Sequence, residues 1–267
     1  MKFFDLHIHS EPDIYKRKYS VDSLNKELYD NNSFGVYKSH SITTISNTNN
    51  FNNLFGSVVL NSTQGGLSLE TLYNMIQSTK KPFIIWLPTI NKIFLNIKNN
   101  KINMSPVEIS ENGKIKDEIK SIIKFCGENN LPIATGHSKK DEIFKVIKIC
   151  KEENAKLIIT HPFYRLTNFS INELTFISEL YENIYFECCI LMGLDNFDSI
   201  KKDIQLINTI GSKRVFVSSD LGQINNCKVS EGYRWYKNQL VNCFGIDDNI
   251  INDLFYYTPK KILLGEN

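Results

Sequence analysis

The chain has 267 residues, of which 42% are hydrophobic and 22% are charged, and its 31 basic residues nearly balance 29 acidic ones. This composition is ordinary for a globular protein, and the length suffices for a substantial buried core. A net charge of only +2 excludes a strongly basic surface, so we expect neither nucleic acid nor a membrane as a partner.

Eight short apolar runs rich in β-branched residues predict strands along the whole chain. In chain order they are Phe3–His9, Val36–His40, Ser57–Asn61, Phe83–Pro88, Pro132–His137, Lys156–His161, Ile184–Ile190 and Arg214–Asp220. Segments with helical periodicity lie between them. The first follows Ser20 and the second follows Ser68, a residue type that commonly caps helices. Four more such segments are DEIKSIIKFCGENN, DEIFKVIKICKEEN, SINELTFISELYEN and DSIKKDIQLINTIG.

Strict alternation of strands and helices predicts right-handed crossovers and a parallel sheet. Eight such units in roughly 250 residues fit a closed (β/α)8 barrel of the TIM type, with a doubly wound open sheet as the alternative. The main interruption, SPVEISENGKIK, follows the fourth strand, and its Asn112-Gly113 pair predicts a small hairpin insertion. Since no linker or repeat divides the chain, we expect one α/β barrel domain over residues 1–267.

Cysteine usage and the first residues both predict a cytoplasmic location. The six cysteines form no Cys-x-x-Cys pair, and Cys188 and Cys189 are neighbours within a strand-like run. This usage is typical of a reducing compartment. The segment MKFFDLHIHS interrupts its apolar residues with polar ones, unlike a signal peptide. The chain also lacks the apolar run of about 18 residues that a membrane helix needs.

All five histidines lie at the downstream ends of predicted strands: His7, His9, His40, His137 and His161. Catalytic groups of a barrel come from these strand ends and the loops after them. Other polar residues at the same ends are Lys38, Asn61, Glu187 and Asp220. Five imidazoles should therefore gather on one face of the barrel.

The spacing of His7 and His9 predicts a shared metal ion, because side chains two residues apart on a strand point to the same side. Imidazole nitrogens together with a carboxylate suit Zn²⁺ above Mn²⁺ or Fe²⁺. A single strand-end histidine is more often a core or capping residue. The combination of His-x-His, Gly-His, Thr-His-Pro and Ser-Ser-Asp, each ending its own strand, favours one or two divalent ions.

The stretches FDLHIHS, GHS, ITHPF and VSSDLG, in this order, resemble the amidohydrolase superfamily of metal-dependent hydrolases. The stretches YKSH, VVLNSTQGGL, IIWLPT and SSDLGQ are similar to a poorly characterised amidohydrolase-like family of unknown function. The resemblance covers essentially the whole chain. It implies a barrel hydrolase whose metal and acid/base positions are matched by His7, His9, His137, His161 and Asp220.

The fourth strand departs from this resemblance. Superfamily members with two metals usually bridge them by a carbamylated lysine or a glutamate there, whereas FIIWLPT offers neither. Either the site holds one ion, or Lys38 is carbamylated into a bridging ligand. Alternatively Lys38 stays an ammonium that pairs with an anionic substrate or with Asp220. Glu187 is a ligand or a partner of Lys38, and His40 is a ligand or a hydrogen-bonding neighbour of one.

These parts suggest a hydrolytic mechanism. A bound divalent ion lowers the pKa of its water to about 7 from 15.7. Asp220 would hold that water, accept its proton and pass it to the leaving group. His161 or His137 would polarise the scissile carbonyl or phosphoryl oxygen. We count Lys38 with Asp220 and His161 as the candidate catalytic group.

Several loop residues are candidates for substrate binding. Arg17, Tyr164 and Arg165 follow strands on the same barrel face, where arginine can clamp an anion, although solvated loop charges need no function. Asn61 and Gln223 lie near the same strand ends and would shape the pocket.

Three functions are consistent with the sequence. The leading one is hydrolysis of an amide, ester or lactone bond in a small, anionic molecule. The second is a phosphoesterase of the histidinol-phosphatase-like class, which normally needs more histidine and acidic ligands than this chain offers. The third is a barrel that binds metal or ligand without catalysis. A small-molecule substrate is the expected partner, and a homo-oligomer is left open.

Overall fold

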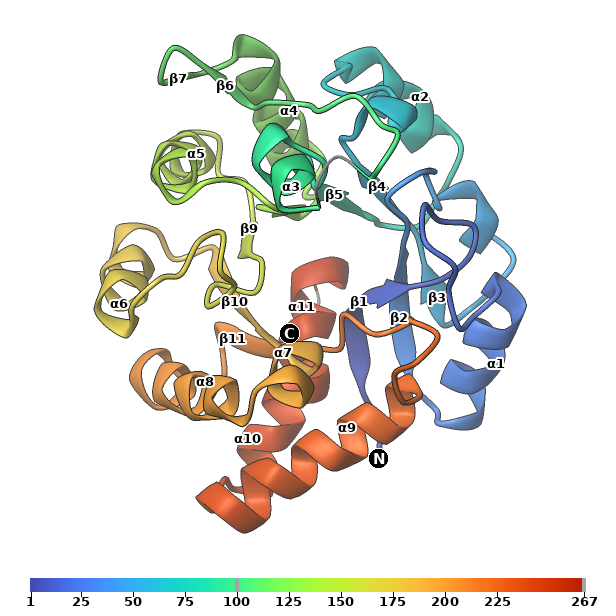
Figure 1. The fold of residues 1–267 in the computed structure, drawn as a ribbon, viewed down its shortest axis with the longest axis vertical. Coiled ribbons are helices and arrows are strands. Elements are labelled where there is room, and N and C mark those ends of the chain that lie inside the picture. Colours follow the sequence, from blue (N-terminus) through green and yellow to red (C-terminus); the bar gives the residue numbers. More distant parts are fainter. Residues whose placement is uncertain (99–100, 266–267) are drawn as a thin grey trace.

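The computed structural model describes residues 1–98 and 101–265, in which parallel strands form a closed barrel surrounded by helices (Figure 1). Around the barrel the strands are β1 (Phe4–His9), β2 (Phe34–Lys38), β3 (Leu54–Phe55) with β4 (Ser57–Val59), β5 (Ile84–Trp86), β8 (Ile133–Ala134), β9 (Leu157–Ile159), β10 (Ile184–Cys189) and β11 (Val215–Ser218). β3 pairs with β2 and β4 pairs with β5, so these two short strands share the third position. The ring closes where Ile8 bridges Leu221. The (β/α)8 barrel is confirmed, and the open-sheet alternative is wrong.

Helices cover the outside of the sheet. They are α1 (Val21–Asp30), α2 (Leu69–Gln77), α3 (Lys92–Ile97), α4 (Asp117–Glu128), α5 (Lys140–Glu152), α6 (Ile171–Leu180), α7 (Ile190–Asp195), α8 (Phe197–Ile210), α9 (Val229–Asn238), α10 (Asp248–Asn252) and α11 (Thr258–Leu264). Short 3-10 turns η1 (Ser46–Thr48) and η2 (Ser62–Gln64) and π-helical turns η3 (Gln239–Cys243) and η4 (Asp253–Tyr257) complete the chain order. No helix in the described ranges combines the length and apolar character needed to cross a membrane.

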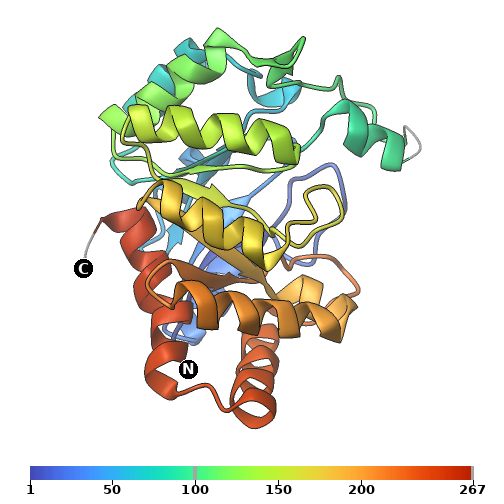
Figure 2. The ribbon, with the colours of Figure 1, turned by 90° about the vertical axis from the view of Figure 1, so that its left-hand side faces the viewer.

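The helix starts follow from the sequence signals. The side chain of Ser20 accepts a hydrogen bond from the main-chain N–H of Ser23, and Ser68 caps α2 in the same way. Leu24 and Leu28 of α1 are buried against the barrel. From the side, α5, α6 and α8 (green to orange) lie one beside the other in front of the strands (Figure 2).

The amino-terminal end of the barrel is filled by apolar side chains. Inward-facing residues of the strands form one cluster with Ile262 and Leu263 of α11: Phe4, Leu6, Val36, Phe55, Val59, Ile84, Trp86, Ala134, Ile158, Tyr185 and Phe216. Alternate residues of a strand point into the barrel because the side-chain period of a strand is two. β1 changes phase at a register irregularity between Asp5 and Ile8, so Phe4 and Leu6 point inward before it and His7 and His9 after it. Since α11 covers this end, the polar side chains at the strand carboxyl ends lie toward the opposite, open end.

Between β5 and β8 the chain forms an antiparallel pair of strands, β6 (Ser110–Glu111) and β7 (Lys114–Ile115). Asn112 and Gly113 connect them with φ angles of 48° and 73°. Positive φ at both central residues is the geometry of a type I′ turn, which Asn-Gly favours.

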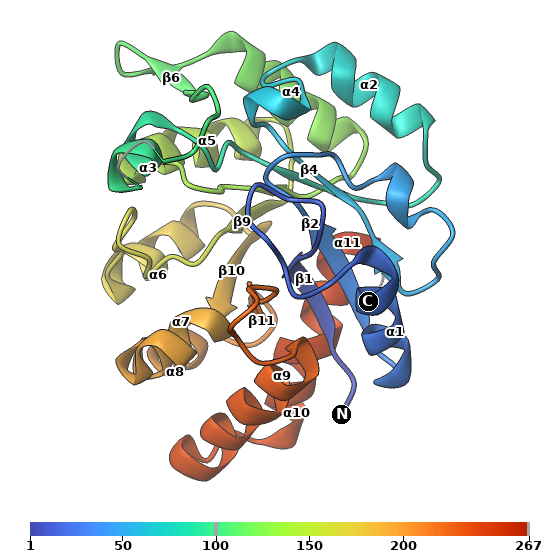
Figure 3. The same cartoon turned by 45° about the vertical axis from the view of Figure 1, so that its right-hand side comes forward.

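The segment after β1 crosses the open end of the barrel (dark blue in Figure 3). The Ser39 hydroxyl donates to the Pro12 carbonyl oxygen at 2.7 Å, and the main-chain N–H of Lys18 donates to the Gly222 oxygen at 2.7 Å. This segment is therefore tied to the loops after β2 and β11, and it forms part of the wall above the strand ends.

Candidate active site

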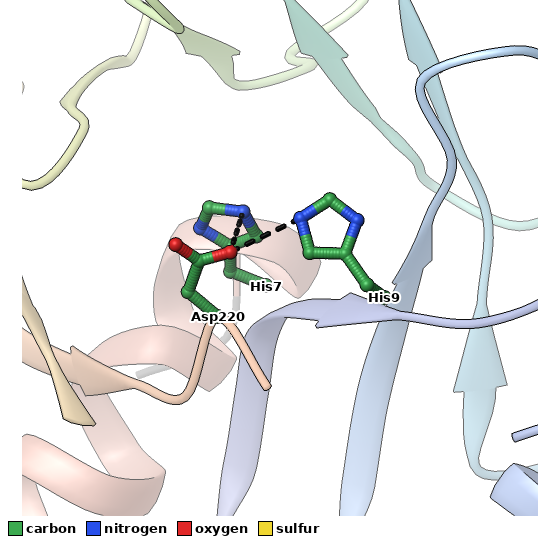
Figure 4. A group of neighbouring side chains, drawn as sticks. All are labelled: His7, His9 and Asp220. Carbon is green, nitrogen blue, oxygen red and sulfur yellow. Dashed lines mark ion pairs between the residues drawn. The ribbon is translucent and has the colours of Figure 1, made fainter. Parts of the chain in front are cut away.

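Two imidazoles and one carboxylate converge at the open end of the barrel (Figure 4). His7 and His9 are buried, and their Nε2 atoms lie 3.1 Å and 3.0 Å from the same oxygen, Oδ1 of Asp220. One ligand atom from each residue lies within 4.8 Å of the others. Both histidines point inward because β1 changes phase at a register irregularity between Asp5 and Ile8. This group therefore has the donor types and proximity of a metal site.

Backbone contacts hold Asp220 against β1. The main-chain N–H of Asp220 donates to the His7 oxygen at 2.8 Å, and Asp220 has a φ angle of 51°. Aspartate tolerates this left-handed conformation better than most residues. Gly222 follows with a φ angle of 126°, and a Cβ there would lie 1.9 Å from the His9 oxygen. The loop after β11 can approach β1 this closely only because residue 222 is glycine.

Asp220 is ionised in this setting. Burial opposes ionisation, but the charge on His7 and hydrogen bonds from His7 and His9 hold the pKa of the Asp220 carboxyl well below its usual range. Burial likewise works against protonation of His7, yet the Asp220 carboxylate raises the pKa of His7. The two side chains therefore form a buried ion pair.

Glu187 lies behind His7 and orients its ring. Its Oε1 atom accepts hydrogen bonds from His7 Nδ1 at 2.9 Å and from the Ser218 hydroxyl at 2.5 Å. Its Oε2 atom accepts from the main-chain N–H of His161 at 2.9 Å. Although burial opposes it, the charge on His7 lowers the pKa of Glu187. An ionised Glu187 keeps the proton on Nδ1, so Nε2, which faces Asp220, is the nitrogen of His7 that would bind a cation.

Lys38 shares this inner space with His7. Its Nζ atom lies 2.9 Å from His7 Nε2 and 3.8 Å from the centre of the Trp86 ring, and the residue is 1% exposed. Burial lowers the pKa of Lys38 to about 8, although Asp220 and Glu187 act in the opposite direction. Trp86 comes from β5, the fourth strand position. Two-metal members of the superfamily that the sequence resembles usually have a carbamylated lysine or a glutamate on that strand.

A second group lies on the other side of His9. The Nδ1 atom of His9 is 3.4 Å from Oδ2 of Asp13, and His40 contributes the third potential donor. However, Arg17 donates to the same Asp13 oxygen from Nη2 at 2.6 Å and from Nε at 2.8 Å. The main-chain N–H of His40 donates to Oδ1 of Asp13 at 2.8 Å. Asp13 is thus committed to Arg17 and His40, and it orients His9.

The sequence prediction did not include Asp13. No sequence signal marks it, because the irregular loop after β1 has no period that places a side chain. The Nδ1 atom of His40 forms a hydrogen bond of 2.8 Å with the Thr89 hydroxyl. Burial, together with the charge on His9, lowers the pKa of His40 well below its usual value, so its ring is neutral.

His137 and His161 complete the ring of imidazoles, with ring centres 5.5 Å apart. His137 donates from Nδ1 to the Thr89 carbonyl oxygen at 2.8 Å. The Nδ1 atom of His161 is buried without a hydrogen-bond partner among the described residues. Burial lowers the pKa of both rings, so both present neutral imidazole, the form that binds metals.

The five histidines, Lys38 and Asp220 line a cavity of about 450 Å³. Of the residues predicted to bind substrate, Arg17, Tyr164 and Gln223 line it. Asn61 is buried and holds neighbouring loops, since it donates to the His40 carbonyl oxygen at 3.0 Å and accepts from two main-chain N–H groups. Arg165 lies beside the Tyr164 ring, outside the described lining. Lining residues that the prediction missed are Tyr15, Lys16, Phe94, Lys98, Leu191, Met192 and Asp195.

The model of a family of unknown function (DUF6282) matches residues 2–187. None of the curated proteins matches the chain significantly. Among solved structures, a zinc-bound amidohydrolase from Burkholderia multivorans has a TM-score of 0.56 at 10% identity, covering 98% of this chain and 99% of its own. A lactonase from Listeria monocytogenes has a TM-score of 0.56 at 10% identity, covering 100% and 95%.

A third structure, 2,6-dihydroxybenzoate decarboxylase from Rhizobium, has a TM-score of 0.58 at 8% identity and covers 98% of this chain and 97% of its own. Identities this low show a common fold and no more. The expectation of a family of unknown function is confirmed by the family model, and these structures show that the chain shares their fold.

Proposed function

Because the chain belongs to the DUF6282 family, whose function is unknown, we propose an activity from the site itself: metal-dependent hydrolysis of an amide, ester or lactone bond in a small, anionic molecule. The observation that carries the proposal is the convergence of His7, His9 and Asp220 within 4.8 Å of one another. This group lies beside a 450 Å³ cavity at the carboxyl ends of the strands, where barrel enzymes place their catalytic residues.

The donor set fits a divalent ion, with zinc preferred over manganese or iron. His7, His9 and Asp220 would hold it, and His161 or His137 would add a further nitrogen. The buried, unpartnered Nδ1 atom of His161 supports this assignment, because such an atom is costly unless it gains a partner. When bound, such an ion supplies an activated water, whose pKa falls to about 7 from 15.7.

Asp220 is the candidate general base. Its ionised carboxylate can accept a proton from water at Oδ1 or Oδ2 and pass it to the leaving group. His137 is neutral and fixed by the Thr89 carbonyl oxygen, so it can orient the substrate carbonyl without changing its charge. Arg17, Lys16 and Lys98 line the cavity and favour an anionic substrate.

The experiment measures metal content and turnover together. Purified protein should carry zinc, manganese or iron and should hydrolyse a member of a panel of amides, esters and lactones. Asp220→Asn should lose turnover while the protein stays folded. Absence of metal and of turnover on every class would refute the hydrolase, and turnover of phosphate esters alone would favour the phosphoesterase. Metal binding that is unchanged by Asp220→Asn, without turnover in either protein, would favour a non-catalytic barrel.

All six cysteines are free, which supports our further proposal that the protein works in the reducing cytoplasm.

A further inference from the structure

Three aromatic side chains line the candidate active-site cavity together with the imidazoles, and the proposed mechanism assigns them no role. The rings of Phe94 and Tyr164 lie against His137, with their centres 4.7 Å and 5.9 Å from the centre of its ring. The ring of Tyr15 contacts His40 edge-on, with 6.4 Å between the ring centres. The cavity therefore has an aromatic wall next to its imidazoles.

This aromatic wall, formed by Tyr15, Phe94 and Tyr164, comes from three separate segments. Tyr15 follows β1, Phe94 belongs to α3 after β5, and Tyr164 follows β9. Leu191 and Met192 of α7, after β10, add apolar surface to the same cavity. Within the described ranges, the rings of Tyr15 and Tyr164 line one cavity without contacting each other. A flat apolar group can therefore lie between the side chains of these segments.

Two cationic side chains lie at the mouth of the same cavity. Lys16 and Lys98 line it and are exposed, whereas His7 and His9 are buried. The Nζ atom of Lys98 lies 5.6 Å from the centre of the Phe94 ring. Neither lysine has an ion-pair partner in the part of the chain that the structure describes. Both ammonium groups therefore remain free to attract an anionic group at the mouth.

We propose that the substrate is an aromatic acid whose ring lies against the aromatic wall and whose carboxylate lies at the cavity mouth, beside Lys16 and Lys98. The bond to be cleaved then lies at the inner end of the ring, toward His7, His9 and Asp220. The place of that bond rests on the proposed function, whereas the contacts of the ring and of the carboxylate require no metal ion. The substrate class is an aryl amide, ester or lactone whose carboxylate is remote from the scissile bond.

Aromatic side chains distinguish a flat aromatic ring from a saturated ring of similar size. The faces and edges of aromatic rings carry opposite partial charges, so a ring packed among them gains attraction beyond the apolar area that it buries. One such contact changes affinity by about two- to twelvefold. A saturated ring buries similar apolar area but lacks this attraction. The aromatic wall should therefore favour aromatic over saturated ligands.

Binding of phenylacetate and cyclohexylacetate tests the ring contact, because these two acids carry the same charge and differ only in the ring. Calorimetry on the purified protein should show phenylacetate binding about fivefold more tightly than cyclohexylacetate. Chelation of bound metal should not remove this preference, since the wall contains no proposed metal ligand. Tyr164→Leu should abolish most of the preference, whereas Tyr164→Phe should keep it, because phenylalanine retains the ring.

Tyr29→Leu is the matched control. This tyrosine is 76% exposed on α1 and lies outside the cavity lining, so its replacement should leave both affinities unchanged. Equal binding of the two acids by the wild type, binding of neither acid, or an undiminished preference in Tyr164→Leu would overturn the inference. The wild-type comparison decides the matter even where Tyr164→Leu fails to fold.

Phenylacetamide, the uncharged analogue, tests the place of the carboxylate. The wild type should bind phenylacetate more tightly than phenylacetamide, and Lys16→Gln combined with Lys98→Gln should reduce that preference about fivefold. Lys148→Gln combined with Lys151→Gln removes the same charge from the exposed face of α5, outside the cavity lining, and should leave the preference nearly unchanged. Equal effects of the two double changes would refute the place of the carboxylate at the mouth.

The outcomes separate this inference from the proposed function. Turnover of aliphatic substrates alone would refute the aromatic substrate and leave the metal-dependent hydrolase intact. Selective phenylacetate binding by a protein that holds no metal and has no turnover would refute the proposed function and leave the aromatic binding site intact.

Discussion

Replacing Glu187 with glutamine should weaken metal binding through the tautomer of His7. The carboxylate accepts three hydrogen bonds, and the one from the main-chain N–H of His161 cannot reverse its direction. The single oxygen of a glutamine must therefore stay with His161, and its NH2 group then faces His7 Nδ1 and the Ser218 hydroxyl. His7 satisfies that donor only by giving up the proton on Nδ1 and keeping the one on Nε2. Nε2 then offers no lone pair to a metal ion.

The magnitude follows from how such partners act in metal sites. Loss of a hydrogen-bonding partner behind a ligating histidine typically costs 10–100-fold in metal affinity, about 1.4 to 2.7 kcal/mol. We expect the upper end, because the Glu187 side chain is fully buried and water cannot replace it. Zinc titration against a competing chelator measures the affinity. The rise in melting temperature on adding zinc should shrink in parallel.

Glu142→Gln is a close control for this change. Glu142 is also a buried glutamate with both oxygens engaged, accepting from the Ser110 hydroxyl at 2.5 Å and from the main-chain N–H of Lys139 at 2.9 Å. It lies on α5, away from the cavity. The control should lose stability but not zinc affinity. Equal zinc affinities in both variants and the wild type would refute the orienting role of Glu187.

Two further predictions concern stability. Gly222→Ala should destabilise the fold by about 2–4 kcal/mol in urea unfolding, because its Cβ would meet the His9 carbonyl oxygen at a positive φ. Gly245→Ala, with a φ of +67° but open space around the added Cβ, should cost about 1 kcal/mol, and equal losses would contradict the argument. Burial raises the pKa of Asp203 from 3.8 to about 7, while Tyr236 donates to it at 2.6 Å. Protonated Asp203 contributes its full stabilisation to the folded state below pH 4. This contribution, on the order of 4 kcal/mol, is lost as the pH rises through 7. Asp203→Asn cannot ionise, so its stability relative to the wild type should increase between pH 5 and pH 8, and an unchanged difference would show that Asp203 does not titrate there.

The barrel could be predicted from the sequence because its signals are local. The β-branched runs and their spacing mark the strands, and Ser20 and Ser68 mark helix starts. That His7 and His9 point to a common side also follows from the strand period of two. Which side they face could not be predicted, because β1 changes phase between Asp5 and Ile8.

The partners within the site could not be predicted, because they are set by packing between distant strands. Glu187 contacts His7, which lies 180 residues away in the sequence. The segment around Glu187, FECC, does not indicate which histidine it contacts. Likewise, Trp86 and Lys38 come from strands that are not neighbours in the sheet. They contact each other only because both side chains pack inside the barrel. Asp13 could not be predicted because it lies in an irregular loop, where no side-chain period indicates which way a residue points.

Closing the barrel and assembling the site are one structural event. The hydrogen bonds that join β1 to the end of β11 run from His9 N–H to the Leu221 oxygen and from Asp220 N–H to the His7 oxygen, each 2.8 Å long. Three of the four residues in these two hydrogen bonds, all but Leu221, are those whose side chains converge. A cation bound by them therefore joins the first and last strands directly. Binding to the folded chain alone would stabilise it by about 2.7 kcal/mol at a free metal concentration 100 times the dissociation constant. Because His7 and Asp220 lie far apart in an open chain, this gain should appear mainly as slower unfolding of the closed barrel, with little change in the early folding steps.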